Sequence, residues 1–223
     1  MSRPASLQSN VIRPTRPSDE EVVGRIAYQT GFFGDSAARY FPDSELFAAL
    51  WAGPYFQGAG AGCYVAEAGG EVLGYVLGAP EHERYQAALR RVVARRLSSS
   101  WPTRRTLLSL RYLLRVARFP SPHASWAAFP AHLHLNLLPA ARGLGLGRRL
   151  LEAHLAALQG LGVGGVQLST TAENRAALGL YRTLGFEVVA SRRTPLWTPW
   201  LRHEAEHLAM ARRLDGGPIP AQG

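Results

Sequence analysis

The stretch His-Leu-His-Leu-Asn-Leu-Leu-Pro-Ala-Ala-Arg-Gly-Leu-Gly-Leu-Gly-Arg-Arg-Leu-Leu, residues 132–151, decides the fold of this chain. Its first part alternates polar and apolar residues with period two, which is the pattern of a β-strand with one leucine face. Pro139 ends this strand, because proline has no N–H to donate to a neighbouring strand. Leucines then recur at helical spacing, at positions 150, 151, 155, 158 and 161. We therefore predict a strand at 132–138, a glycine-rich turn and a helix at 147–161.

The glycine-rich turn has the features of an anion site. Gly143, Gly145 and Gly147 stand at alternate positions, so backbone N–H groups can approach a ligand without interference from Cβ atoms. These N–H groups open a helix, whose dipole favours an anion, and Arg142 and Arg148 add positive charge. The turn lacks the Lys-Ser/Thr ending of a P-loop, which argues against a nucleoside triphosphate. We predict a diphosphate ligand; the alternative is a tight strand-to-helix connection without a ligand.

The rest of the chain divides into short elements of both kinds. Ser18 and Glu21 form a predicted capping box at the start of the first helix. The patterns predict further strands at 11–13, 63–67, 72–78, 163–170, 186–190 and 207–214, and helices at 18–29, 44–51, 81–97, 103–119 and 173–184. We expect one α/β domain at 11–214, with flexible tails at 1–10 and 215–223.

Composition narrows the class of protein. The chain has 223 residues, of which 47% are hydrophobic and 18% are charged, as in ordinary globular proteins. A single cysteine, Cys63, excludes an intramolecular disulfide. There is no run of about 18 apolar residues for a membrane span, and the polar start, Met1–Asn10, is unlike a secretory signal. We expect a soluble, cytoplasmic protein, and the sequence leaves open whether it is a homodimer.

The positive charge is concentrated in one segment. Residues 82–118 contain ten arginines and one acid, Glu83, so their net charge of +9 equals that of the whole chain. The apolar spacing predicts a helical hairpin here. Three interpretations remain open: a solvated helix face, a lid over a substrate, or a surface that attracts an acidic substrate. No recognised binding motif accompanies the charge, which argues against a nucleic-acid partner.

Two motifs resemble those of the GNAT acetyltransferases. Arg142, Gly145 and Gly147 fill the positions of the family's [Arg/Gln]-x-x-Gly-x-[Gly/Ala] loop. About thirty residues later, the chain matches the family's downstream motif N-x-x-A-x-x-x-Y-x-x-x-G-F, through Asn174, Ala177, Tyr181, Gly185 and Phe186. The stretch from residue 130 to 139 also resembles the acetyltransferase-like domain attached to some O-GlcNAc hydrolases. The resemblance implies a GNAT-like splayed mixed β-sheet flanked by helices, in which the arginine-rich hairpin, about 81–130, is an insertion.

The resemblance also implies acetyl-CoA as co-substrate and an amine as acceptor, with direct attack of the amine on the thioester. Leu137 then offers its backbone N–H to the thioester carbonyl, and Asn174 holds the pantetheine arm or begins a helix. Tyr181 is the implied general acid for the departing thiolate; the alternative is a packed aromatic beside Phe186. The implied cofactor-binding residues are Leu137, Arg142, Gly143, Leu144, Gly145, Leu146, Gly147, Arg148, Asn174 and Tyr181.

His132 and His134 point to one face of their predicted strand, and either could be the base that deprotonates the amine. They are also compatible with a structural role in the sheet, or with zinc, although no third ligand is evident. Two other functions compete with catalysis: a non-catalytic acyl-CoA-binding module, and a basic adaptor for anionic partners.

Overall fold

The computed structural model describes residues 10–99 and 101–217 of the chain, so the predicted tails lie largely outside its described part. Seven strands form one sheet in the order β1-β2-β3-β4-β5-β7-β6. The strands are β1 (Val11–Pro14), β2 (Tyr64–Ala68), β3 (Glu71–Ala79), β4 (Ala131–Leu137), β5 (Gly165–Thr171), β6 (Glu187–Thr194) and β7 (Ala205–Arg213). Only the central pair, β4 and β5, is parallel; each of the other neighbours is antiparallel.

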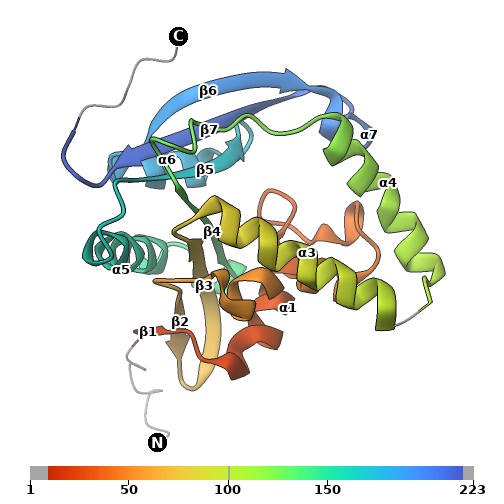
Figure 1. The fold of residues 1–223 in the computed structure, drawn as a ribbon, viewed down its shortest axis with the longest axis horizontal. Coiled ribbons are helices and arrows are strands. Elements are labelled where there is room, and N and C mark those ends of the chain that lie inside the picture. Colours follow the sequence, from red (N-terminus) through yellow and green to blue (C-terminus); the bar gives the residue numbers. More distant parts are fainter. Residues whose placement is uncertain (1–9, 100, 218–223) are drawn as a thin grey trace, which may run out of the picture.

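Helices cover both faces of this sheet (Figure 1). They are α1 (Glu20–Thr30), α2 (Ser44–Trp51), α3 (His82–Ser99), α4 (Arg104–Arg118), α5 (Leu146–Gly160), α6 (Arg175–Thr183) and the short α7 (Thr198–Leu201). One core joins α1 and α2 to β3, and a second joins α5 and α6 to β5 and β7. The prediction of a mixed α/β fold is therefore confirmed.

The sheet splays between β4 and β5. The two strands pair only at Ala131 with Val166 and at His132 with Gln167, and then part towards their carboxyl ends. On its other side β4 pairs with β3 from His132 to Leu137. The parting creates a gap in the middle of the sheet, as the GNAT resemblance implied.

The alternation that predicted β4 also explains which side chains face the gap. Leu133 and Leu135 lie on the α5 and α6 face, packed in the cores of that side. The polar residues that alternate with these leucines turn to the opposite face of the sheet. There Asn136 donates a hydrogen bond to Thr30 Oγ1 at the end of α1 (2.6 Å). A strand with period two thus separates an apolar face from a face that carries His132, His134 and Asn136.

Some local predictions are wrong. Ser18 does not cap a helix, because Pro17–Asp19 form a 3₁₀ turn and α1 begins after it. The carboxylate of Asp19 accepts the N–H of Arg16 (2.7 Å) and pairs with Arg13 (2.7 Å). A proline at the start of the turn and this ion pair fix a conformation that the capping pattern does not contain.

The C-terminal elements extend beyond their predicted bounds. β6 continues to Thr194, since Arg192 and Arg193 pair with the opposite strand although they are exposed and polar. The residues of β6, a strand at the edge of the sheet, are mostly exposed, so they need not alternate between apolar and polar. The hydropathy pattern therefore did not show where this strand ends. The turn and helix at 195–201, which were not predicted, bring Trp197 into the core beside α1 and α2.

The arginine-rich segment forms the two predicted helices, α3 and α4, here called the helical pair (82–118). Figure 1 shows the two helices spreading apart from the turn that joins them. Asp43, which caps α2, ties α4 to the rest of the protein: it accepts a hydrogen bond from Thr106 (2.6 Å), and its N–H donates to Ser109 (3.1 Å). The description of the pair as an insertion into the family fold stays a prediction.

Candidate active site

A cavity of about 420 Å³ opens where β4 and β5 part, and we call it the glycine cavity. Its wall is built by the end of β4, the turn after it, and the first turns of α5 and α6. It is lined by Thr30, Phe33, Gly34, Asn136, Leu137, Ala141, Arg142, Gly143, Gly145, Leu146, Gly147, Arg148, Asn174, Ala176, Ala177 and Leu180. Of the ten predicted cofactor-binding residues, the structure brings eight together here; Leu144 and Tyr181 are not in the lining.

The glycines of the turn lie in conformations that favour glycine. Gly143 has φ 77° and Gly145 has φ 73°, in the left-handed region that other residues adopt at a cost. A Cβ atom at either position would meet nothing within 4 Å, so it would project into open space. Gly147 differs, because a Cβ there would press on Leu137 and Leu180. The first two glycines thus keep a space clear, and the third allows close packing.

The backbone of the turn can hold an anion. Gly145 precedes α5 without a side-chain cap, so the N–H groups of the first helical turn, from Leu146 onward, lack intrahelical acceptors. The guanidinium of Arg142 donates to Gly34 O (2.6 Å), which holds it at the mouth of the cavity. Arg148 is exposed and pairs with Glu152 (3.0 Å), four residues along α5. The local charge therefore complements a phosphate group.

The N–H of Leu137 points into the gap. Leu138 donates its N–H to Leu73 O on β3 (2.9 Å). Successive backbone N–H groups of a strand alternate in direction, so the N–H of Leu137 faces the opposite side, from which β5 has parted. This is the position from which a backbone donor could bind a carbonyl oxygen held between the strands.

A second cavity, of about 270 Å³, adjoins the first, and we call it the aromatic cavity. It shares Thr30, Phe33, Gly34, Asn136 and Asn174 with the glycine cavity. It is also lined by Ala27, Gly31, Tyr40, Trp51, Tyr75, Tyr112, Val116, Ser121, His134, Ser169, Thr170, Thr171, Leu196, Trp197 and His207. The lining contains six aromatic rings and no Asp, Glu, Lys or Arg. The two cavities together run through the splay of the sheet.

Five of these six rings, all but that of Tyr75, pack in one group, which Trp51 joins through Tyr112. The ring centroids of Tyr40 and Trp197 lie 5.0 Å apart, those of Tyr112 and Trp197 5.3 Å, and those of Phe33 and Trp197 5.2 Å. Such spacings are typical of aromatic pairs with a favourable relative orientation. Because Tyr112 and Val116 come from α4, the inner face of the helical pair contributes part of this wall.

Two histidines line the aromatic cavity, and sequence reasoning found one of them. Burial lowers the pKa of His134 to about 4, so this imidazole is neutral at pH 7. His207, on β7, was missed; its Nδ1 lies 3.2 Å from Ser121 Oγ, and its buried Nε2 has no hydrogen-bond partner among the described residues. Burial lowers its pKa as well. Neither its strand, β7, nor its neighbours in the sequence carry a motif that would have singled it out.

His132 lies outside both cavities. Its ring stands against Tyr85, with centroids 4.4 Å apart, and near Trp126, at 5.9 Å. Burial, with His134 and His82 nearby, lowers the pKa of His132 to about 3. The strand that places His134 in the aromatic cavity thus places His132 under the helical pair, away from the gap.

Tyr181 is buried on α6, and its ring lies 5.8 Å from that of Phe186. Burial raises its pKa to about 12, so the phenol keeps its proton at neutral pH. Burial, and then the nearby Tyr181, raises the pKa of Tyr75, a residue of the aromatic cavity. The side chain of Tyr181 is in the lining of neither cavity, but Ala176, Ala177 and Leu180 of the same helix line the glycine cavity.

The arginine rows of α3, at 90, 91, 95 and 96, are not in the lining of either cavity. Within the described ranges, no group of three His, Cys, Asp or Glu side chains could hold a metal ion. A search of the same residues for a helix long and apolar enough to span a membrane found none.

Comparison with known proteins gives a consistent picture. The model of the acetyltransferase (GNAT) family matches residues 118–186. The crystal structure of SsHAT is 32% identical, over 92% of this chain and 98% of that one, with a TM-score of 0.69. The structure of yncA, a putative acetyltransferase from Salmonella typhimurium with its cofactor acetyl-CoA, is 17% identical over 95% of this chain and 98% of that one, with a TM-score of 0.59. At that identity the likeness shows the fold alone.

A shorter similarity covers part of this region. Over 64 residues the chain is 42% identical to the mycothiol acetyltransferase of Pseudarthrobacter chlorophenolicus, covering 29% of this chain and 20% of that enzyme. The chain thus spans about a fifth of this curated relative. Since the family model covers the turn and helix that line the glycine cavity, and the similarity to SsHAT runs along nearly the whole chain, this protein belongs to the GNAT family of acetyltransferases.

Proposed function

We propose that this chain is an N-acetyltransferase that moves an acetyl group from acetyl-CoA to a small primary amine with an apolar or aromatic body. The observation that carries the proposal is the pair of adjoining cavities at the splay, one lined by an anion-binding turn and the other by aromatic rings. Acetyl-CoA supplies an activated acetyl group as a thioester, and its anionic diphosphate fits a turn whose Gly143 and Gly145 leave space for it.

In this proposal different groups of the chain bind different parts of acetyl-CoA. The N–H groups at the start of α5, with Arg142 and Arg148, hold the diphosphate. The N–H of Leu137 donates to the carbonyl oxygen as negative charge develops on it, a contribution that typically accelerates acyl transfer about 100- to 1000-fold. Asn174, in the lining of both cavities, fixes the pantetheine arm at the junction.

The aromatic cavity selects the acceptor. It offers no carboxylate to pair with an ammonium, because its wall combines aromatic rings with uncharged polar side chains. The burial that lowers the pKa of His134 to about 4 would also lower the pKa of a bound ammonium. The amine therefore reacts in its neutral form, and His134 accepts the proton that it releases.

The thiolate that leaves the acetyl group needs a proton donor. As the amine nitrogen bonds to the carbonyl carbon, the carbon–sulfur bond breaks and the thiolate takes up a proton. The hydroxyl of Tyr181 keeps its proton at neutral pH, because burial raises its pKa to about 12, and it belongs to α6, whose residues Ala176, Ala177 and Leu180 line the glycine cavity. Tyr181 donates this proton, directly or through a hydrogen bond that stabilises the thiolate.

The experiment measures acetyl-CoA binding by calorimetry and amide formation with a panel of amines. Gly145→Asn is the test variant, because asparagine tolerates positive φ but puts a side chain into the cavity. Gly162→Asn is the matched control: Gly162 also has positive φ (72°) and open space, but it lies at the far end of α5. We expect binding about tenfold weaker or more in Gly145→Asn, and unchanged binding in the control.

The outcomes separate the competing functions. Equal affinity for acetyl-CoA in both folded variants would show that the diphosphate does not bind at the turn. Tight binding of acetyl-CoA without transfer to any amine would instead indicate a non-catalytic acyl-CoA-binding module. Among the amines, we expect phenethylamine and benzylamine to react faster than spermidine or an amino acid, whose extra charges have no partner in the aromatic cavity.

A further inference from the structure

Large apolar side chains of the helical pair are exposed to solvent. Trp101, in the turn between the helices, is 93% exposed, Leu97 79% and Leu114 70%. Val93, Leu107, Leu108 and Leu110 are exposed as well. These seven make up most of the large apolar side chains that the described residues expose. An apolar surface of this kind marks an interaction site more often than a solvated face.

The outer face of α4 alternates leucine with arginine. Leu107 and Leu114 are seven residues apart and therefore lie on one side of the helix. Arg104, Arg111 and Arg118 repeat with the same spacing and lie beside them. The opposite side of α4 holds the buried residues Ser109 and Tyr112. The mixed leucine and arginine face is thus the one that the fold leaves uncovered.

Most of the positive charge of the helical pair has no ion-pair partner among the described residues. No acidic residue occurs between Arg84 and Leu151. Within the described part of the chain, the ion pairs of the helical pair are Arg84 with Glu81 (3.6 Å) and Arg96 with Glu45 (3.0 Å). Arg104, Arg111 and Arg118 are exposed and enter none of the ion pairs of those residues.

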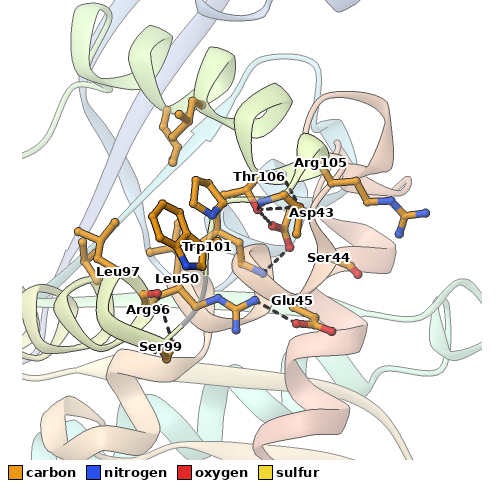
Figure 2. Close-up of a pocket in the computed structure, with 16 residues that line it drawn as sticks. Asp43, Ser44, Glu45, Leu50, Arg96, Leu97, Ser99, Trp101, Arg105 and Thr106 are labelled. Atoms are coloured by element: carbon orange, nitrogen blue, oxygen red, sulfur yellow. Dashed lines mark hydrogen bonds and ion pairs between the residues drawn. The ribbon is translucent and has the colours of Figure 1, made fainter.

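A groove of about 620 Å³ lies between α2 and the two helices of the pair. Leu97 and Trp101 belong to its lining, and the Arg96 side chain of α3 reaches across to pair with Glu45 of α2 (Figure 2). Leu107, Leu108 and Leu114 are not in its lining. A partner that only filled the groove would therefore leave the outer leucines of α4 in water.

We propose that the helical pair docks this protein on an anionic phospholipid surface. The arginines contact lipid phosphates, which guanidinium groups bind well, while Leu97, Trp101 and Leu114 enter the boundary between headgroups and acyl chains. A second copy of the chain fits less well, because it would bring a segment of +9 against another of +9. Nucleic acid would match the charge but would not cover the leucines.

The proposal is independent of the acetyl transfer described above. Its first test sediments the full chain with vesicles of phosphatidylcholine alone, and with vesicles in which phosphatidylglycerol is mixed in. We expect binding to the anionic vesicles only, decreasing as salt is added. The fluorescence of Trp101 should shift to shorter wavelength on binding, and Trp101→Phe should remove the shift while binding is kept.

Two variants with matched controls locate the surface. Leu97→Ser with Leu114→Ser should weaken binding about tenfold or more, whereas Leu161→Ser with Val188→Ser, at exposed positions elsewhere, should leave it unchanged. Neutralising Arg104, Arg111 and Arg118 to glutamine should also weaken binding about tenfold or more. The same change at Arg182, Arg192 and Arg193, which are exposed on other elements, should have little effect.

Three results would overturn the proposal. The first is equal binding by the variants of the helical pair and their controls. The second is tight binding of a DNA oligonucleotide that competes with the vesicles and does not depend on Leu97 and Leu114, which would assign the charge to nucleic acid. The third is a dimer in sedimentation velocity that dissociates in the Leu97→Ser, Leu114→Ser variant, with no vesicle binding by the native chain; this would assign the surface to a second copy.

Discussion

The hydroxyl of Tyr181 can be tested separately from the packing of its ring. Tyr181→Phe keeps the ring beside Phe186 and removes the phenolic proton. We expect kcat to fall about 100-fold, because a proton donor to the thiolate is lost, while the affinity for acetyl-CoA stays the same. Steady-state kinetics together with calorimetry measure the two effects. Unchanged turnover with a good acceptor would make Tyr181 a packing residue.

His134 and His207 are the two candidates for the proposed base, because both line the aromatic cavity. We expect His134→Gln to lower kcat about 100-fold, because glutamine keeps a polar side chain but accepts no proton at neutral pH. His207→Gln should have a smaller effect, since Ser121 already engages its ring. His203→Gln, at an exposed position, serves as control. A larger loss at His207 than at His134 would reverse the assignment.

The residues of the turn could be predicted from the sequence because the motif is local. Eight of the ten predicted cofactor-binding residues line one cavity. The aromatic cavity could not be predicted in the same way, because Tyr40, Tyr75, Tyr112 and Trp197 come from separate parts of the chain. His132 and His134 look equivalent in the sequence, and the packing of Tyr85 and Trp126 against His132 separates them.

Among the elements, α4 depends on its link to α2. Asp43→Ala removes both the cap of α2 and the acceptor of Thr106, and the cap alone is worth about 1 kcal/mol. We expect trypsin to cleave faster within 82–118, where the arginines lie, and the overall stability to fall modestly. Ser36→Ala, which removes a cap in a 3₁₀ turn away from α4, is the control. Equal cleavage rates in the two variants would show that Asp43 does not hold the pair.

Elements with clear periodicity were predicted within a few residues, as β4 and α5 show. The errors have physical causes: an ion pair at Asp19 replaced the predicted cap, and β6 runs along an open edge where polar residues are tolerated. The splay itself was implied by the family resemblance and not by the hydropathy, because a strand that loses its partner halfway keeps the same alternation.

For the molecule as a whole, buried neutral histidines couple stability to pH. Burial lowers the pKa of His132 to about 3 and those of His134 and His154 to about 4. In the unfolded chain these groups titrate near 6.5, so between pH 6.5 and 4 the unfolded state binds more protons. The free energy of unfolding should therefore have its full value above pH 6.5 and fall as the pH decreases towards 4.

Urea denaturation at several pH values measures this dependence. His154 offers the clearest test, because it is fully buried and its Nδ1 lies 2.7 Å from Gly62 O. His154→Gln should lower the stability at pH 6.5 and flatten its decrease towards pH 4. His203→Gln should leave the pH dependence unchanged. A native protein whose stability is the same at both ends of this range would contradict the assignment of neutral buried histidines.

The parting of β4 from β5 has a consequence for the exchange of amide hydrogens with deuterated solvent. Leu138 N–H is bonded to β3, and the N–H of Asn136 points the same way, so both should exchange slowly. The N–H groups of Leu135 and Leu137 face the gap and should exchange quickly in the free protein. One strand would thus show fast and slow amides in alternation. If acetyl-CoA fills the gap as proposed, the fast amides of β4 should become slow on its addition, while those of β7, paired on both sides, should keep their rates.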